Sequence, residues 1–140
     1  MTRPQSGIAV IIRDERENQV LLLKRRNEPG AGCWAFPGEE QREYESFEEC
    51  ANRIIKHDTG LAVQLIDSSP HEVVETISRK SGVHYNTGFI RARYTMISGK
   101  PQIVHPSEYD GFVWSRWGDL PEPLLSSIKE LKERGYNPFG

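Results

Sequence analysis

The sequence predicts an α/β fold in which a mixed β-sheet is sandwiched between helices (α/β/α). Short apolar, β-branched runs at 7–12 and 20–25 have the length of strands rather than of helices. Helical apolar patterns cover 46–59 and 121–134. Because domains commonly have roughly 100–150 residues, the chain is expected to form a single domain over residues 1–140.

The strands are predicted in order from apolar runs bounded by polar turns. Segment 14–18 is a polar turn between the first two strands, and segment 79–82 is expected to turn a later hairpin. Between the second strand and the first helix, residues 27–39 are rich in Gly and Pro and predict an ordered loop. The remaining strands are predicted at 61–66, 72–78, 84–96 and within 112–117.

The first helix has the clearest local signals. Ser46 and Glu49 form a capping box, in which each side chain binds the other residue's backbone amide. Gly60 is placed to end the helix, because glycine readily adopts the left-handed backbone conformation of a helix C-terminus. The sequence therefore predicts a helix that begins and ends at defined residues.

Composition and charge exclude several classes of protein. The formal net charge of −2 gives no basic field for a nucleic acid polymer. No apolar run approaches the roughly 20 residues that span a bilayer, and no apolar segment follows Arg3 as in a signal peptide. Cys33 and Cys50 lie far apart without metal-ligand spacing, so free thiols are expected. These features predict a cytoplasmic protein with no membrane partner; whether it forms a homodimer stays open.

Segment 36–61 carries the residues that point to chemistry. It contains Phe-Pro-Gly at 36–38, followed by a spaced set of glutamate, arginine, glycine and apolar positions. This segment resembles the box of the Nudix hydrolase family: a Gly, a Glu six residues later, and then Arg-Glu-apolar-x-Glu-Glu-x-Gly-apolar. Aligned without gaps, the chain matches the box at Glu45, Arg53, Ile55, Gly60 and Leu61.

The similarity extends beyond the box. Segments 20–32, 84–87, 114–121 and 132–139 look like the eukaryotic MutT-homologue branch, whose members hydrolyse purine nucleoside triphosphates. The resemblance implies a Nudix fold and a small-molecule partner, either a nucleoside triphosphate or a nucleoside diphosphate-linked ligand.

The box is degenerate at the positions that bind metal in the family. Three glutamates of an intact box share one helical face, because residues three and four apart are neighbours, and they bind divalent cations. Here these positions hold Ile54, His57 and Asp58. The resemblance implies Mg²⁺ or Mn²⁺ as cofactor, held by Asp58, His57 and the Gly38 carbonyl, but imidazole suits Mn²⁺ better than Mg²⁺. Whether Glu39 or Glu40 replaces the lost carboxylates stays open.

The remaining roles also follow from the resemblance. Glu45, Arg53 and Asp58 are expected to be catalytic, although a purely structural Glu45–Arg53 ion pair explains the first two equally well. Residues 105–110 occupy a loop where some relatives place a base. The residues expected to bind substrate are Lys24, Arg25, Trp34, His84, Tyr85 and Thr87.

Three functions remain open from the sequence. The first is a slow or specialised diphosphatase that uses Asp58 with His57 or a loop glutamate. GDP-mannose hydrolases of the family also have a thinned box and keep its last acid. The second is an inactive nucleotide-binding module, and the third is a metal-free reaction in the same pocket.

Overall fold

A computed structural model describes residues 3–140, so the first two residues of the predicted domain lie outside it. The described chain is built from two α-helices, one short 3₁₀-helix and eight strands of one sheet. In chain order the elements are β1 (Gln5–Asp14), β2 (Gln19–Arg25), β3 (Trp34–Ala35), β4 (Gly38–Glu40), α1 (Phe47–Thr59), β5 (Gln64–Leu65), β6 (Glu72–Ser78), β7 (Val83–Arg93), η1 (Met96–Ser98), β8 (Tyr109–Arg116) and α2 (Ser126–Glu133).

The sheet is mixed, as the sequence predicts. Its two longest strands, β1 and β7, run parallel and pair from Gln5↔Tyr85 to Arg13↔Arg93. All other pairs are antiparallel: β2 and β4 pair with β1, β3 and β8 with β2, and β5 and β6 with β7. Strands that are remote in the sequence therefore meet at β1, which places residues near 7–9 beside residues near 38–40 and 85–89.

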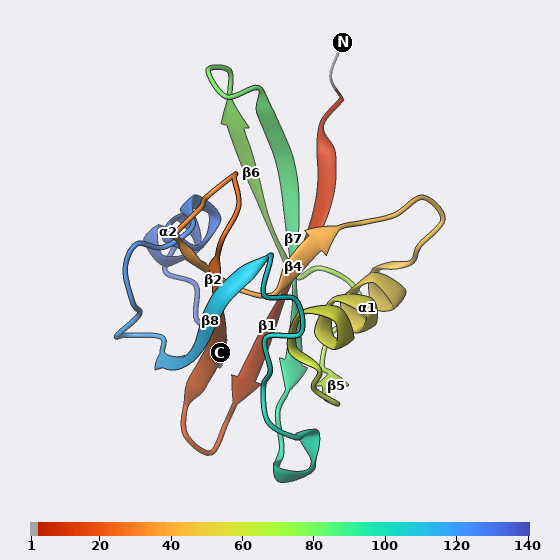
Figure 1. The fold of residues 1–140 in the computed structure, drawn as a ribbon, viewed down its shortest axis with the longest axis vertical. Helices are drawn as coiled ribbons and strands as arrows, with labels where there is room; N and C mark the ends of the chain where they lie inside the picture. Colours follow the sequence, from red (N-terminus) through yellow and green to blue (C-terminus); the bar gives the residue numbers. More distant parts are fainter. Residues whose placement is uncertain (1–2) are drawn as a thin grey trace.

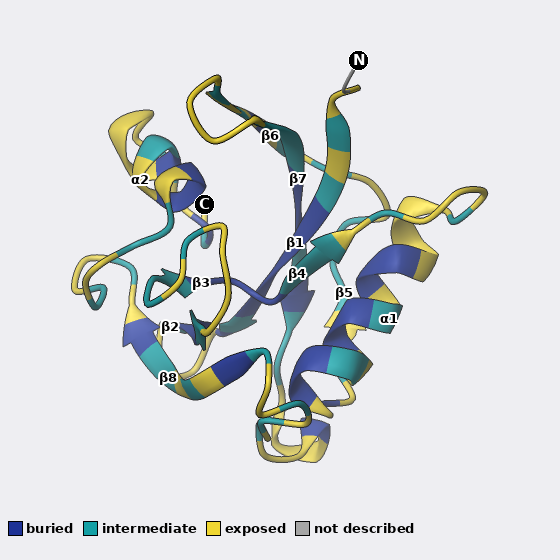
Figure 2. Cartoon of the chain, turned by 45° about the horizontal axis from the view of Figure 1, so that its top comes forward, coloured by how far each residue is buried: buried dark blue, intermediate teal, exposed yellow. Residues whose placement is uncertain are grey.

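The two helices cover opposite faces of this sheet (Figure 1). Successive side chains of a strand point to opposite faces, and β1 uses both. Ile8 and Val10 pack in the cluster that includes α1, whereas Ala9 and Ile11 pack in the cluster that includes Ile128 of α2. The buried stripe of α1 faces the sheet (Figure 2). The fold is therefore the predicted three-layer α/β/α arrangement.

Helix α1 has the predicted ends. The Ser46 side chain accepts a hydrogen bond from the Glu49 amide, and the Glu49 carboxylate accepts one from the Ser46 amide. Gly60 has φ 68° and ends the helix with its N–H on the Lys56 carbonyl. These caps fix which helix residues face the sheet.

Other predicted boundaries are wrong. Helix α2 begins at Ser126, because Pro121 and Pro123 lack amide hydrogens and disfavour helical geometry in the residues before them. Residues 121–125 instead pass β3, where the Trp34 amide donates to the Pro123 carbonyl. The strand predicted to reach residue 96 ends at Arg93, and the one predicted at 61–66 shrinks to Gln64–Leu65. The segment predicted as a loop at 27–39 contains β3 and the start of β4. No helix of the described chain has the length and apolar character needed to cross a bilayer.

Candidate functional site

A pocket of about 390 Å³ opens on the α2 side of the sheet. Its floor includes side chains from β1, β6 and β7, and the N-terminal end of α2 forms one wall. Residues 38–40 and 108–109 form the rim on the side of α1. The pocket therefore lies where the loop predicted to carry the family's chemistry meets the central strands.

Three of the six predicted substrate-binding residues line this pocket: Arg25, Tyr85 and Thr87. His84 does not, because neighbours on a strand point to opposite faces; its ring instead lies 3.0 Å from a Glu75 carboxylate oxygen. The structure thus divides the predicted set into residues of the pocket and residues outside it.

Lys24 and Trp34 also lie outside the pocket lining. They face each other across β2 and β3, with the Lys24 ammonium nitrogen 6.0 Å from the centre of a Trp34 ring. Lys24 and Arg25 differ in direction because neighbours on a strand point to opposite faces, and the pairing of β2 with β8 shifts register between them. Arg25 lines the pocket, and its Nε–H donates to the Pro29 carbonyl at 2.8 Å.

Glu45 and Arg53 are in direct contact, as the resemblance to the family's box implies. Arg53 Nε donates to one Glu45 carboxylate oxygen at 2.7 Å and its Nη2 donates to the other at 2.9 Å. Arg53 Nη2 also donates to the Glu40 carbonyl at 2.9 Å. The Arg53 hydrogen bond is the main cause that lowers the Glu45 pKa to about 2. The pair therefore connects the loop after β4 to helix α1, which agrees with the interpretation of Glu45 and Arg53 as a structural ion pair.

Asp58 is buried at the end of α1, with 1% of its surface exposed. Its Oδ2 atom accepts hydrogen bonds from the Gly38 amide at 3.1 Å and from the Tyr109 hydroxyl at 3.0 Å. Its Oδ1 atom has no hydrogen-bond partner among the described residues. Burial, followed by the negative charge of Glu39, raises the Asp58 pKa to about 7. The side chain is therefore held firmly through one oxygen while the other lacks a partner.

Glu39, His57 and Asp58 form a group that suits a divalent cation. His57 Nε2 lies 3.6 Å from a Glu39 oxygen and 3.9 Å from Asp58 Oδ1. One potential ligand atom from each residue lies within 4.8 Å of the others. Two carboxylates and an imidazole fit Mn²⁺ or Zn²⁺, and the unpartnered Asp58 oxygen is the atom that a cation would satisfy. The donor set therefore fits the cofactor that the box implies, with Glu39 as an additional carboxylate.

Ile54 does not join this group. Its side chain is fully buried and packs in the apolar cluster between α1 and the sheet, with neighbours such as Val10 and Ile90. The expected ligand face therefore consists of His57 and Asp58 alone. The second carboxylate of the group is that of Glu39 on β4. There the backbone of Gly38 approaches β1 closely: a Cβ on Gly38 would lie 3.1 Å from the Ile8 carbonyl oxygen.

Sequence reasoning missed Tyr109, which supports Asp58 from β8. The two residues are separated by 51 positions, and only the pairing of β8 with β2 brings Tyr109 to the end of α1. Burial, followed by the negative charge of Asp58, raises the pKa of the Tyr109 hydroxyl, which therefore stays a hydrogen-bond donor. No local pattern signals such a contact, because the strand register decides it.

Comparison with known proteins agrees with this architecture. A sequence model of the NUDIX domain matches residues 3–134. The crystal structure of a MutT NUDIX hydrolase from Burkholderia pseudomallei is 30% identical, with a TM-score of 0.80 over 94% of this chain and 98% of that chain. The NUDIX domain of Shewanella oneidensis NrtR, crystallised with ADP ribose, has a TM-score of 0.69 at 22% identity over 96% of this chain and 90% of that chain.

A curated relative matches a shorter segment. An ADP-ribose pyrophosphatase from Methanocaldococcus jannaschii is 47% identical over 47 residues, which is 34% of this chain. The match covers only 28% of that protein's length.

Proposed function

Since this chain belongs to the Nudix family by the match over residues 3–134, we propose that it is a specialised diphosphatase of the family. Its proposed substrate is a nucleoside diphosphate linked to a second group, with ADP-ribose as the first compound to test. The similarity to an ADP-ribose pyrophosphatase and to a domain crystallised with ADP ribose supports this choice. Purine nucleoside triphosphates are the second class to test.

One observation carries the proposal: Glu39 of the Glu39, His57 and Asp58 group lines the pocket, which places the other two residues of the group directly beside it. A divalent cation bound there would supply charge neutralisation for a diphosphate and activation of water. The unpartnered Asp58 oxygen supports a role beyond packing, because buried polar atoms are normally satisfied. Glu39 also lines the pocket.

The other lining residues have roles that follow from their chemistry. Arg25 offers a guanidinium to a ligand phosphate, since guanidinium groups bind phosphate through paired hydrogen bonds. Tyr85 offers an aromatic ring for a base, and Thr87 a hydroxyl that both donates and accepts hydrogen bonds. The pocket volume of about 390 Å³ lies in the range of small-molecule sites.

A panel experiment tests this function. Calorimetric titration with ADP-ribose, a nucleotide sugar and purine nucleoside triphosphates, each with Mn²⁺, Mg²⁺ or chelator, measures binding, and chromatography of the same mixtures measures cleavage. We expect cation-dependent cleavage of a diphosphate compound, and weak activity with Mg²⁺. The Asp58→Asn variant, which keeps the shape of the side chain but not its charge, should lose cleavage. His84→Asn is the control, because His84 lies outside the pocket lining. If the protein neither binds nor cleaves any of these compounds, the proposal is contradicted.

A nucleotide-binding module without hydrolysis is the second candidate. The burial of Ile54 in the apolar cluster favours it, because one of the family's carboxylates is replaced by hydrocarbon that cannot bind a cation. The same panel separates the two functions: the module predicts binding of the intact ligand and no product with any cation.

A further inference from the structure

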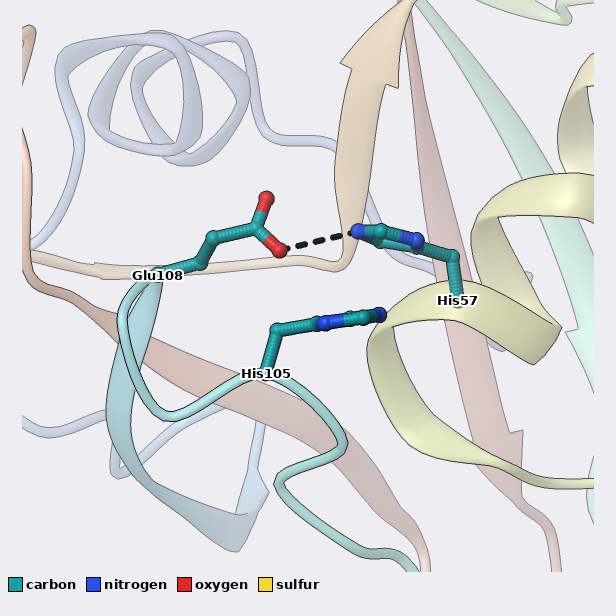
Figure 3. A group of neighbouring side chains, drawn as sticks. All are labelled: His57, His105 and Glu108. Carbon is teal, nitrogen blue, oxygen red and sulfur yellow. Dashed lines mark hydrogen bonds and ion pairs between the residues drawn. The ribbon is translucent and has the colours of Figure 1, made fainter.

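The loop before β8 places two potential metal ligands against helix α1 (Figure 3). The His105 ring stacks on the His57 ring, with 4.0 Å between the ring centres and 22° between the planes. A Glu108 carboxylate oxygen lies 2.8 Å from His57 Nε2. One nitrogen or oxygen atom from each of these three residues lies within 4.8 Å of the others.

This loop is held in place by the end of β2. The Arg26 amide donates to the Glu108 carbonyl and its Nη1 donates to the Pro106 carbonyl, each at 2.9 Å. Asn27 Nδ2 donates to the Ser107 carbonyl at 3.0 Å. Within the loop, the Glu108 amide donates to the His105 carbonyl at 2.9 Å. Hydrogen bonds to the loop backbone therefore fix the positions from which the His105 and Glu108 side chains reach α1. Neither of these side chains takes part in the hydrogen bonds that hold the loop.

A second observation points to a ligand at the same place. Asp58 Oδ1, buried and without a hydrogen-bond partner in the described chain, lies 3.9 Å from His57 Nε2. This oxygen and the Glu108 carboxylate therefore both lie near the same nitrogen, His57 Nε2. The side chains of His57 and Glu108 are each about one-third exposed, so an ion from solvent can reach them.

We propose that His57, His105 and Glu108 form a binding site for a borderline transition-metal ion, Zn²⁺ or Co²⁺, rather than for Mg²⁺. Two imidazoles and one carboxylate are a ligand set that zinc accepts with a further position left open, whereas Mg²⁺ prefers oxygen ligands in octahedral geometry. In this site the loop before β8 supplies ligands that the helix lacks at Ile54. The inference rests on the proposed function only in that the metal site lies beside the pocket to which the substrate is proposed to bind.

Metal binding to the chelator-treated protein, measured without substrate, tests the site. We expect one equivalent of Zn²⁺ to bind, and Mg²⁺ to bind much more weakly. Loss of a ligand in His105→Asn or Glu108→Gln should weaken Zn²⁺ binding by at least about 10- to 100-fold, the loss that even supporting residues of metal sites produce. The matched control is His84→Asn, since His84 also pairs with a glutamate, Glu75, and is similarly exposed; its Zn²⁺ affinity should equal that of the unmodified protein.

The visible absorption spectrum of bound Co²⁺ gives a second measurement. It should change in His105→Asn and stay unchanged in His84→Asn, because only the former removes a nitrogen ligand. Equal Zn²⁺ affinity in the unmodified protein and in both loop variants would overturn the site, even if hydrolysis is observed. Conversely, selective Zn²⁺ binding with no cleavage of any nucleotide would support the site and contradict the proposed function.

Discussion

Replacing Ile54 by glutamate, the residue that an intact box carries there, should destabilise the protein rather than restore a metal site. Ile54 is fully buried in the cluster between α1 and the sheet. Its removal forfeits roughly 1.5–3 kcal/mol of apolar burial. An unpaired carboxyl group costs about 1–3 kcal/mol even when neutral. A buried glutamate can have a pKa near 8–9, so it is protonated in the folded protein at pH 7 but ionised in the unfolded chain. Taking up that proton on folding costs roughly 4 kcal/mol, at about 1.36 kcal/mol per unit between pH 7 and the ordinary glutamate pKa of about 4.3.

The sum, roughly 6–10 kcal/mol, is comparable with the whole stability of an ordinary domain, about 5–15 kcal/mol. Urea unfolding of Ile54→Glu and of the apolar control Ile54→Val, near pH 7 and near pH 5, measures it. The control should lose only about 0.5–1.5 kcal/mol. Relative to that control, the glutamate variant should recover roughly 3 kcal/mol at the lower pH, because the proton that the buried side chain takes up on folding costs about 1.36 kcal/mol less for each unit by which the pH falls. A glutamate variant as stable as the valine variant, or one that gains Mg²⁺ affinity without loss of stability, would refute this reasoning.

Three further predictions concern the same region. The metal-free protein should lose stability as the pH rises from about 4 to 7, by at most roughly 4 kcal/mol. The reason is that the folded-state pKa of Asp58 is raised to about 7 from an ordinary value of 3.8. Urea unfolding across this pH range should show a smaller change of stability for Asp58→Asn than for the unmodified protein. Glu45→Gln should cost about 1–3 kcal/mol, since it weakens the paired hydrogen bonds from Arg53, and limited proteolysis should then cut the loop after β4 faster. The chelator-treated protein should stay folded with a cooperative melting transition, because α1 has its own capping box and apolar stripe; loss of that transition would reveal a structural cation.

Local signals predicted the elements that local interactions specify. Helix α1 begins after Ser46 and ends at Gly60 because both caps are made by residues within a few positions of each helix end. By contrast, β3 and β4 have only two and three residues, which is too short for any periodicity to show. Their pairing with β2 and β1 decides that they are strands. The two prolines before α2 displaced its start from the predicted residue 121.

The candidate site follows the same division. The Glu45–Arg53 contact connects neighbouring parts of one motif, so the resemblance to the family's box implies it. Tyr85 lines the pocket and His84 does not, because only one face of β7 is turned toward the side of the sheet that α2 covers. Contacts of Asp58 with Tyr109 and of His57 with Glu108 each join residues 51 positions apart. Such contacts depend on sheet register, which the sequence pattern alone does not specify.

The most direct test of the proposed function is the incubation of ADP-ribose and Mn²⁺ with the unmodified protein, Asp58→Asn or Glu39→Gln. The products are measured by ³¹P NMR after a chelating resin has removed the paramagnetic Mn²⁺. The two carboxylates belong to the group that adjoins the pocket through Glu39, so loss of either charge should weaken cation binding and slow cleavage. We predict that the diphosphate signals convert to phosphomonoester signals with the unmodified protein, and at least about tenfold more slowly with either variant, which corresponds to about 1.36 kcal/mol of transition-state stabilisation. Equal rates for all three proteins would contradict the assignment of Glu39 and Asp58 to the site.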